Sequence, residues 1–269
     1  MYAVDFEYDG RYLSDYGFIV CNFKSASGAE TIESGAKITF NTVLRNGGRL
    51  HSLASTKYDE CIKATFHICK NPDIYDDMTI TAEEYRALAR WLNRKEFLKF
   101  RPFDNEKELV PCYYEASFNI DKVKINELLY GIELNMVTNR PFGFGDEVRK
   151  VYEFSDISES HILHDISDEI GHLYPTMNIT CYEDGDLTIS NDMTNCEMTV
   201  RNCTDGEIIT INGDLHSINS SIAEHDIHND FNYDYFKIGN TINNRDNVIK
   251  ANLPCKIELS YFPTIKNSL

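Results

Sequence analysis

The densest cluster of polar side chains in this sequence lies near its carboxyl end. It consists of His225-Asp226-Ile227-His228-Asn229-Asp230. In a loop, imidazole nitrogens and carboxylate oxygens at this spacing could bind a divalent metal ion. The same residue types are typical of a solvated loop between strands. We favour the solvated loop and predict no metal ligands here.

Sugar hydrolysis is a second chemistry that the side chains suggest. Asp184 and Asp186 could be the paired carboxylates of a glycosidase at the mouth of a jelly roll. However, residues 145–269 hold 22 acidic residues, so two neighbouring acids are expected by chance. There is no G-x-S-x-G, P-loop or H-E-x-x-H motif. We therefore predict no catalytic residue and no cofactor.

A β-sandwich could bind sugars without cleaving them. Such sites usually present an aromatic platform, often a tryptophan, for stacking on the sugar ring. The carboxyl-terminal half has no tryptophan, and its candidate substitutes are Tyr174, Tyr182, Tyr233, Tyr235 and Tyr261. We interpret these tyrosines as core or rim residues and keep sugar binding as an alternative function.

Cysteines and glycines offer two further motifs. None of the eight cysteines forms a C-x-x-C pair, and this spacing favours reduced, buried thiols over disulfides or zinc. Gly143 and Gly145 resemble part of a dinucleotide fingerprint, but Val148 stands where the third glycine would be. With Pro141 nearby, we interpret this stretch as a linker between domains.

Charge supports two domains and excludes some partners. The 269 residues carry a formal net charge of −17, with −3 on residues 1–144 and −14 on residues 145–269. Such a surface disfavours binding of a phosphate backbone or an anionic membrane, and no run of apolar residues is long enough for a membrane span. The amino terminus shows no secretory signal, so we expect the chain to fold in the cytosol. We place the domains at 1–144 and 145–269.

The first domain contains one convincing helix, predicted over residues 82–94. Thr81 as N-cap and Glu84 three residues later form a capping box, with Ile80 and Tyr85 at the hydrophobic-staple positions. Tyr85, Leu88, Ala89 and Leu92 then follow helical spacing, as one apolar stripe that must face a core. Arg90, Arg94 and Lys95 would occupy the last turn. A strand containing Phe97-Leu98-Lys99-Phe100 should follow and stop before Pro102.

Strand patterns dominate the rest of the first domain. The predicted strands lie within residues 16–23, 60–69, 113–120 and 128–137. Between the first two runs a polar, Gly- and Ser-rich segment, residues 24–58, is too long for an ordinary loop. We predict that this belt segment pairs with a neighbouring molecule. Its scattered apolar residues are the candidate interface: Ile38, Phe40, Val43 and Leu44.

The second domain is predicted to be all β. Residues 177–181, 196–200 and 255–261 alternate between apolar and polar side chains, as strands with one buried face do. Residues 208–211 and 215–218 flank Asn212-Gly213, a strong hairpin signal. Strands recur about every ten residues, which favours a sandwich or jelly roll.

Several stretches follow one another along the chain in a characteristic order. These are Ser14-Asp15-Tyr16-Gly17-Phe18-Ile19-Val20, the belt segment, Ile68-Cys69-Lys70-Asn71-Pro72 before the helix, Thr204-Asp205-Gly206-Glu207, Asp234-Tyr235-Phe236-Lys237 and the final strand KIELSYF. In this order of features the whole chain resembles the distal tail proteins of siphophages, which are baseplate hub components.

The resemblance implies a fold and a set of partners. The first domain would be a β-sandwich or split-barrel-like domain with one α-helix, and the second a galectin-like jelly-roll β-sandwich. First domains would form a hexameric ring closed by the belt. One ring face would join the tail tube protein, and the other a tail-associated lysin or fibre protein. DNA and the tape-measure protein would pass through the channel, with no membrane insertion. The chain would lie at the virion tail tip after assembly in the cytoplasm of the bacterial host. The alternatives are a carbohydrate-binding module and a two-domain glycosidase.

Overall fold

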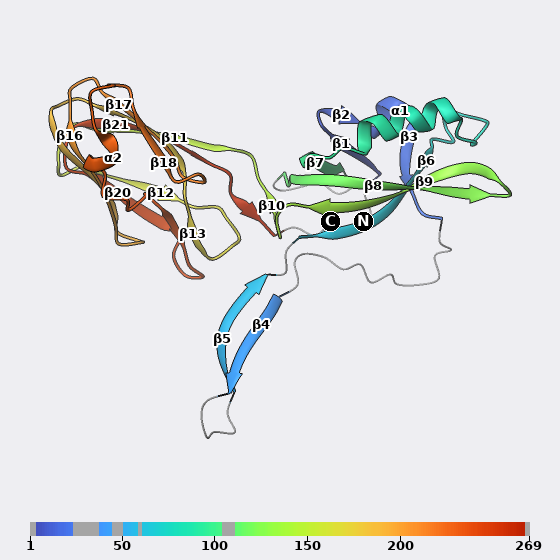
Figure 1. Ribbon diagram of the computed structural model, residues 1–269, viewed down its shortest axis with the longest axis horizontal. Coiled ribbons are helices and arrows are strands. Elements are labelled where there is room, and N and C mark those ends of the chain that lie inside the picture. The colour runs from blue at the N-terminus through green and yellow to red at the C-terminus, as the bar shows by residue number, and fades with distance from the viewer. Residues whose placement is uncertain (1–3, 24–37, 45–50, 59–60, 104–110, 267–269) are drawn as a thin grey trace. The chain divides into compact units, whose positions relative to one another are not determined.

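The protein is mainly β, as the sequence predicts (Figure 1). The computed structural model describes residues 4–23, 38–44, 51–58, 61–103 and 111–266. The chain divides into two compact units, Met1–Gly145 with Ile265–Leu269, and Asp146–Thr264.

A seven-stranded antiparallel sheet forms the body of the first unit. Its strand order is β2-β1-β7-β8-β9-β6-β3. The bounds are β1 Asp5–Tyr8, β2 Arg11–Tyr12, β3 Phe18–Cys21, β6 Lys63–Lys70, β7 Leu98–Phe103, β8 Tyr114–Ile125 and β9 Leu128–Thr138. A short 3-10 helix spans Leu13–Tyr16, and β10 Gly143–Phe144 pairs with β22 Thr264–Ile265. The four predicted strand regions of this domain are thus present as β3, β6, β8 and β9.

Helix α1, Ala82–Leu92, begins where the sequence predicts. Glu84 N donates to Thr81 Oγ1 at 3.2 Å and Thr81 N donates to Glu84 Oε2 at 2.7 Å, so the capping box is complete. The helix ends two residues before the predicted 94, because Asn93 leaves the helical conformation with a ψ of 83°. Arg94 and Lys95 therefore follow the helix and do not belong to its last turn.

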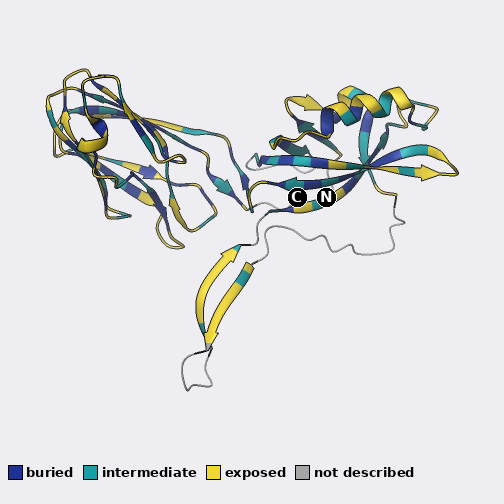
Figure 2. Cartoon of the chain, viewed as in Figure 1, coloured by how far each residue is buried: buried dark blue, intermediate teal, exposed yellow. Residues whose placement is uncertain are grey.

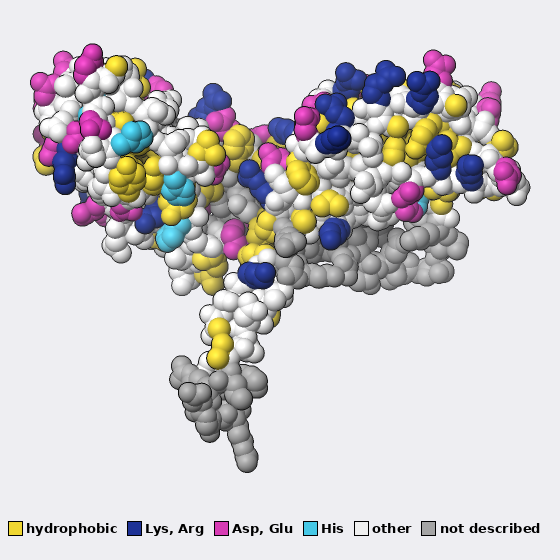
Figure 3. Space-filling view, in the orientation of Figure 1, with side chains coloured by type: hydrophobic (Ala, Val, Ile, Leu, Met, Phe, Trp, Pro, Cys, Tyr) yellow, Lys and Arg dark blue, Asp and Glu magenta, His cyan; other side chains and the backbone are white. Residues whose placement is uncertain are grey.

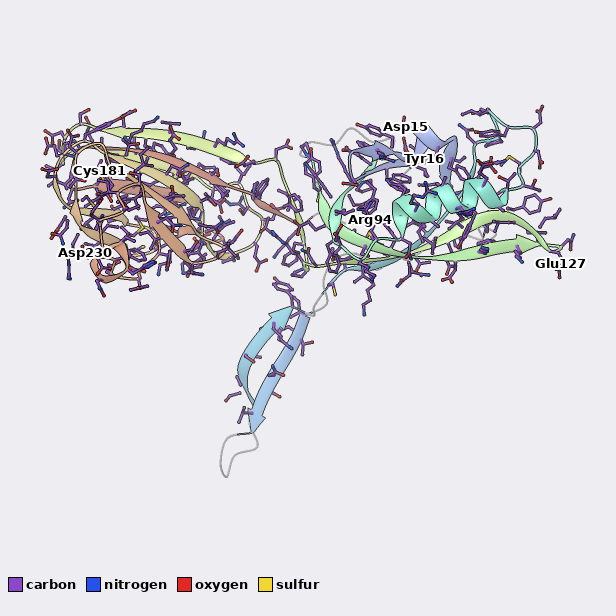
Figure 4. All side chains as sticks on the ribbon, turned by 45° about the horizontal axis from the view of Figure 1, so that its top comes forward. Asp15, Tyr16, Arg94, Glu127, Cys181 and Asp230 are labelled. Carbon is purple, nitrogen blue, oxygen red and sulfur yellow. The ribbon has the colours of Figure 1, made fainter. Side chains whose placement is uncertain are left out.

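The buried face of α1 completes the core of the first unit. Leu88, Trp91 and Leu92 are buried in one cluster with aromatic residues of the sheet. Trp91 stacks on Tyr16 with ring centroids 4.6 Å apart, and its Nε1 donates to Tyr8 O at 3.0 Å. Trp91 thus belongs to the packed face of α1. Figure 4 shows Tyr16 beside the helix.

Two strands extend beyond their predicted ends. β7 continues through Pro102, where the sequence analysis placed its stop. Only Leu98–Phe100 pair with β8, and Pro102 lies opposite Phe6 of β1. A missing N–H is tolerated on an edge without a second partner strand. β8 continues past residue 120 to Ile125, before a turn where Asn126 and Glu127 both have positive φ, and Figure 4 shows Glu127 at this tip.

The second unit is a β-sandwich. One sheet has the order β11-β21-β14-β17-β18 and the other β12-β20-β15-β16. The bounds are β11 Val148–Phe154, β12 Ser160–His164, β13 Gly171–Leu173, β14 Thr176–Cys181, β15 Gly185–Asn191, β16 Cys196–Cys203, β17 Ile208–Asn212, β18 Ser217–Ser220, β19 Ile238–Asn240, β20 Asp246–Ala251 and β21 Cys255–Tyr261. β13 pairs with β19. Buried residues of both sheets share one core cluster, among them Ile179, Ile189 and Ile257.

The alternating segments bury the predicted faces. Every second residue is buried in β14 from Met177, in β21 from Cys255, and in β16 from Cys196 as far as Val200. Figure 2 shows the resulting alternation of buried and exposed positions along the strands. The period-two pattern therefore sets which side chains form this core.

The hairpin predicted at Asn212-Gly213 forms, with Asn212 as the last residue of β17. β17 and β18 pair from Asn212 opposite Ser217, so residues 213–216 form the loop. A Cβ on Gly213 would lie 2.4 Å from the carbonyl oxygen of Tyr174, and close packing requires glycine there. Leu215, predicted in the strand, lies in the loop and is 75% exposed.

Candidate functional site

The described part of the belt segment is a β-hairpin of exposed residues. β4 Ile38–Leu44 pairs with β5 His51–Tyr58, and neither pairs with any other strand of the described residues. Figure 2 colours most of this hairpin as exposed. Both outer edges therefore present backbone N–H and C=O groups that another strand could pair with.

Three of the four predicted interface residues are exposed apolar side chains. Ile38 is 48% exposed, Phe40 61% and Val43 56%. Leu44 is the last residue of β4 and pairs with His51. The structure thus places all four residues on one strand, β4. In the sequence they were only scattered apolar residues in a polar segment.

Register adds a residue that the sequence analysis missed. Ile38 and Phe40 share one face of β4, and the next residue of this face, Thr42, lies opposite Leu53. The register shift between Asn41 and Thr42 is what turns Leu53 to this side. Leu53 is 59% exposed. Leu53 and Ala54 stand in a largely polar stretch of β5, and this pattern gave no signal of its own.

Tyr58 anchors the carboxyl end of the hairpin within the first unit. Its ring lies 4.6 Å from the Phe142 ring in an edge-on contact. Lys266 Nζ donates to Tyr58 OH at 3.2 Å and lies 5.0 Å from the Phe142 centroid. The hairpin is therefore held at Tyr58 and is exposed along β4.

The polar cluster at residues 225–230 takes part in a buried ion pair. His225 Nδ1 donates to Glu207 Oε1 at 2.5 Å, and His225 Nε2 lies 3.4 Å from Asp230 Oδ2. Ser220 Oγ also donates to Glu207 Oε1, at 2.5 Å. Residues 227–230 form the short helix α2, Ile227–Asp230, where a loop was predicted. Glu207 was missed because its partner lies 18 residues away in an acid-rich half.

This cluster is structural in its geometry. The side chains of Glu207 and His225 are 0% and 4% exposed. Ser220 and His225 both bond to the same carboxylate oxygen, so the histidine does not act as a base toward the serine hydroxyl. Among the described residues no group of three or more His, Cys, Asp or Glu could hold a metal ion.

Titration of this pair should shape the stability of the second unit. Burial alone would raise the pKa of Glu207, but hydrogen bonds from Ser220 and His225 bring it below its ordinary 4.5. Burial alone would lower the pKa of His225, but Glu207 holds it above its ordinary 6.5. The ionised Glu207 carboxylate stabilises the folded second unit, and this stabilisation is lost as pH falls through its lowered pKa. The protonated His225 also stabilises the folded unit, and this stabilisation is lost as pH rises through its raised pKa.

We expect Glu207→Gln to lower the unfolding free energy of the second unit by about 3 kcal/mol near pH 6, because the buried imidazolium loses the carboxylate bonded to its Nδ1 and keeps only the more distant Asp230. The loss should shrink at pH values below the lowered pKa of Glu207 and above the raised pKa of His225. Hydrogen exchange of residues 146–264 across this range measures it. Asp246→Asn, which breaks the exposed His164–Asp246 pair at 2.7 Å, is the control and should change little. A pH-independent loss would contradict the assignment.

The glycosidase and sugar-platform candidates occupy other roles. Asp184 Oδ1 accepts from Asp205 N at 2.7 Å and Asp186 Oδ1 accepts from Asn202 N at 3.0 Å, so both carboxylates fix turns. Of the five tyrosines, Tyr235 and Tyr261 are buried, whereas Tyr182 and Tyr233 are exposed. The hydroxyl of Tyr182 bonds to Glu153, and that of Tyr233 donates to the carbonyl of His228.

The cysteines and the G-x-G stretch serve packing. All eight cysteines are free, and five are buried. Burial raises the pKa of Cys196 to about 11 and that of Cys255 to about 12, so both stay protonated and are poor nucleophiles. A Cβ on Gly143 would lie 2.4 Å from Cys112 Sγ, and a strand, β11, follows this stretch where a phosphate-binding site needs a helix.

Surface charge differs between the two units. In Figure 3, Lys and Arg side chains gather over α1 of the first unit. Arg86, Arg90 and Arg94 are exposed there at four-residue spacing. Most of the acidic excess lies in the second unit. No described helix has both the length and the apolar character to cross a membrane.

Two families of phage tail domains match this chain. Residues 1–140 match the phage tail protein N-terminal domain, and residues 142–261 match the phage tail C-terminal domain. No curated protein matches the sequence.

One solved structure shares this fold over nearly the whole chain. It is the crystal structure of the Dit protein (gp 19.1) of phage SPP1, described as a paradigm of the hub adsorption apparatus in phages that infect Gram-positive bacteria. The TM-score is 0.66 at 13% identity, covering 96% of this chain and 98% of that one. Because the N-terminal family alone covers residues 1–140 of 269, the chain belongs to the family of phage tail proteins.

Proposed function

We propose that this tail protein is the distal tail protein of a siphophage, the hub that joins the tail tube to the tail tip. The exposed β4–β5 hairpin carries the proposal, because two open strand edges and an apolar face are suited to pairing with another molecule. The fold shared with a hub adsorption protein supports the same role.

The belt segment closes the ring in this proposal. The hairpin of one copy docks on the first unit of the next, through an apolar contact centred on Phe40 and Leu53 and through strand pairing at its edges. Such a contact joins different surfaces of two identical chains, and it closes on itself when the rotation divides a full turn. Six copies, the number implied by the resemblance to distal tail proteins, weigh about 186 kDa from 31.0 kDa each.

The partners of the ring follow from its place in the tail. One face contacts the tail tube protein and the other a tail-associated lysin or fibre protein. The tape-measure protein and DNA pass through the centre without specific binding, and an acidic protein gives phosphates no gain from counterion release. The role is structural, at the tail tip of a virion assembled in the bacterial cytoplasm.

Mass in solution tests the proposal. We expect light scattering over a concentration series to show a species of about 186 kDa, alone or with the tail tube protein. Negative-stain images should show closed rings. A particle of 31.0 kDa under every condition, including with the tube protein, would rule the ring out.

A further inference from the structure

A pocket of about 210 Å³ opens in the second unit beside the segment that follows β12. Its walls come from that segment, from β13 and β19, and from the turn between β17 and β18. The lining includes Asp165, Ser167, Ile170, Tyr174, Asp214 and Asn240. These groups mix hydrogen-bond acceptors with apolar surface, and neither the tail family nor the ring accounts for them.

Asn240 supplies an acceptor that nothing in the described chain satisfies. The residue is 5% exposed, and its Nδ2 donates to the carbonyls of Ser167 at 2.7 Å and Glu169 at 3.3 Å. These bonds fix the orientation of the amide, because a flipped amide would set oxygen against oxygen. Its Oδ1 is buried and has no hydrogen-bond partner. A buried acceptor without a donor is costly and points to a donor that binds there.

Asp165 adds a negative charge at the same place. It is 1% exposed, and its Oδ1 accepts from Ser167 N at 3.1 Å and from Ser167 Oγ at 2.8 Å. No Lys or Arg of the described chain forms an ion pair with it. The Tyr261 hydroxyl also lies beside this carboxylate, and burial together with this charge raises the pKa of Tyr261, but all of these neighbours are neutral and leave the negative charge without a cation. Asp214, exposed at the pocket edge, contributes a second carboxylate.

We propose that this pocket receives the guanidinium group of an arginine side chain presented by a partner protein. The acceptors call for a cationic donor. They lie on separate elements, and no three acidic or histidine side chains of the described residues converge as a metal site would require. A guanidinium spreads five donors over a planar fork and therefore reaches acceptors that a compact ion does not.

The apolar part of the lining suits the same guest. Tyr174 is partly exposed in the wall, and a guanidinium stacks on an aromatic ring more readily than an ammonium does. Ile170 is 51% exposed at the pocket and offers contact to the aliphatic stem of the arginine or to its neighbours in the partner chain. The inference concerns the second unit alone and holds whether or not the first unit forms a ring.

Binding of a short probe tests the pocket. The probe is the peptide acetyl-Ala-Arg-Leu-amide, and its neutral match carries citrulline in place of arginine. In saturation-transfer NMR with the full chain, we expect the arginine peptide to bind at least about tenfold more tightly than the citrulline peptide. A lysine peptide should also bind more weakly. Equal affinity of the arginine and citrulline peptides, or tighter binding of lysine, would overturn the proposal.

Variants of pocket residues test whether the arginine peptide binds in this pocket. Asp165→Asn can keep both bonds from Ser167, since both end on one oxygen, while it removes the charge and replaces the other acceptor oxygen by an NH2 group. We expect it to weaken arginine binding by at least about tenfold. Asp214→Asn, at an exposed position, should also weaken binding of the arginine peptide. If Asp165→Asn unfolds, Asp214→Asn serves as the test of the pocket. Asp205→Asn, an exposed acid outside the pocket, is the control. Undiminished binding to both Asp165→Asn and Asp214→Asn would refute the site.

Discussion

The double variant Phe40→Ser, Leu53→Ser is expected to remain a monomer of 31.0 kDa at concentrations where the natural chain forms a ring. Both side chains lie on one face of the β4–β5 hairpin, 61% and 59% exposed, so the variant loses little internal packing. Burying each in an interface contributes about 2 kcal/mol. Losing both weakens every contact of the ring by roughly a thousandfold.

Light scattering and negative-stain images of the two chains make this comparison. Ile242→Ser is the matched control, because Ile242 is 82% exposed in the loop before β20 and lies outside the hairpin. The control should assemble like the natural chain, and thermal unfolding of all three should agree. If the double variant still forms rings, the apolar face of the hairpin does not close them, and another part of the first unit must do so.

The sequence predicted best the features that local chemistry decides. The start of α1 is fixed by Thr81 and Glu84, whose side chains bond to backbone groups only three residues away. The buried faces of β14 and β21 follow from strict alternation. Where several local sequence signals agree, they specify the local structure, and tertiary contacts change it little.

Features that depend on distant contacts were predicted incompletely. Gly213 lies in the predicted turn, but the nearby carbonyl of Tyr174, which leaves no room for a side chain there, comes from a distant part of the chain. Pro102 was expected to end β7, but only the pairing with β1 extends that far, so no ladder bond is lost. A single sequence does not show which distant residues will lie beside Gly213 or Pro102.

In the candidate sites, too, locally determined features were predicted and features that depend on distant contacts were missed. Phe40 could be picked out because a strand-like apolar residue in a long polar segment has little to pack against. Leu53 reaches the same face only through a register shift. Glu207 looked like one acid among many, and its burial depends on His225 and Ser220 arriving from the far side of a hairpin. Likewise, the orphaned oxygen of Asn240 is apparent only once its amide nitrogen is seen to be occupied.

Leu88→Glu is expected to unfold the first unit while the second unit stays folded. Leu88 is 1% exposed in the core beneath α1, so the variant either buries a carboxylate or expels the helix from the sheet. Removal of a buried leucine alone costs about 3 kcal/mol, and an unpaired buried charge adds more. The core cluster of the second unit contains only residues of that unit, and nothing in it depends on Leu88.

Hydrogen exchange of the full chain separates the two units in one measurement. Peptides from residues 61–103 should lose protection in Leu88→Glu, those from 146–264 should keep it, and the ring should be lost as well. Ala87→Glu places the same charge one residue earlier on the exposed face of α1 and should leave protection and assembly intact. Loss of protection throughout 146–264 would mean that the units unfold together. Retained assembly in Leu88→Glu would mean that the ring does not require the packed first unit, so its contacts would have to come from the hairpin and the second unit alone.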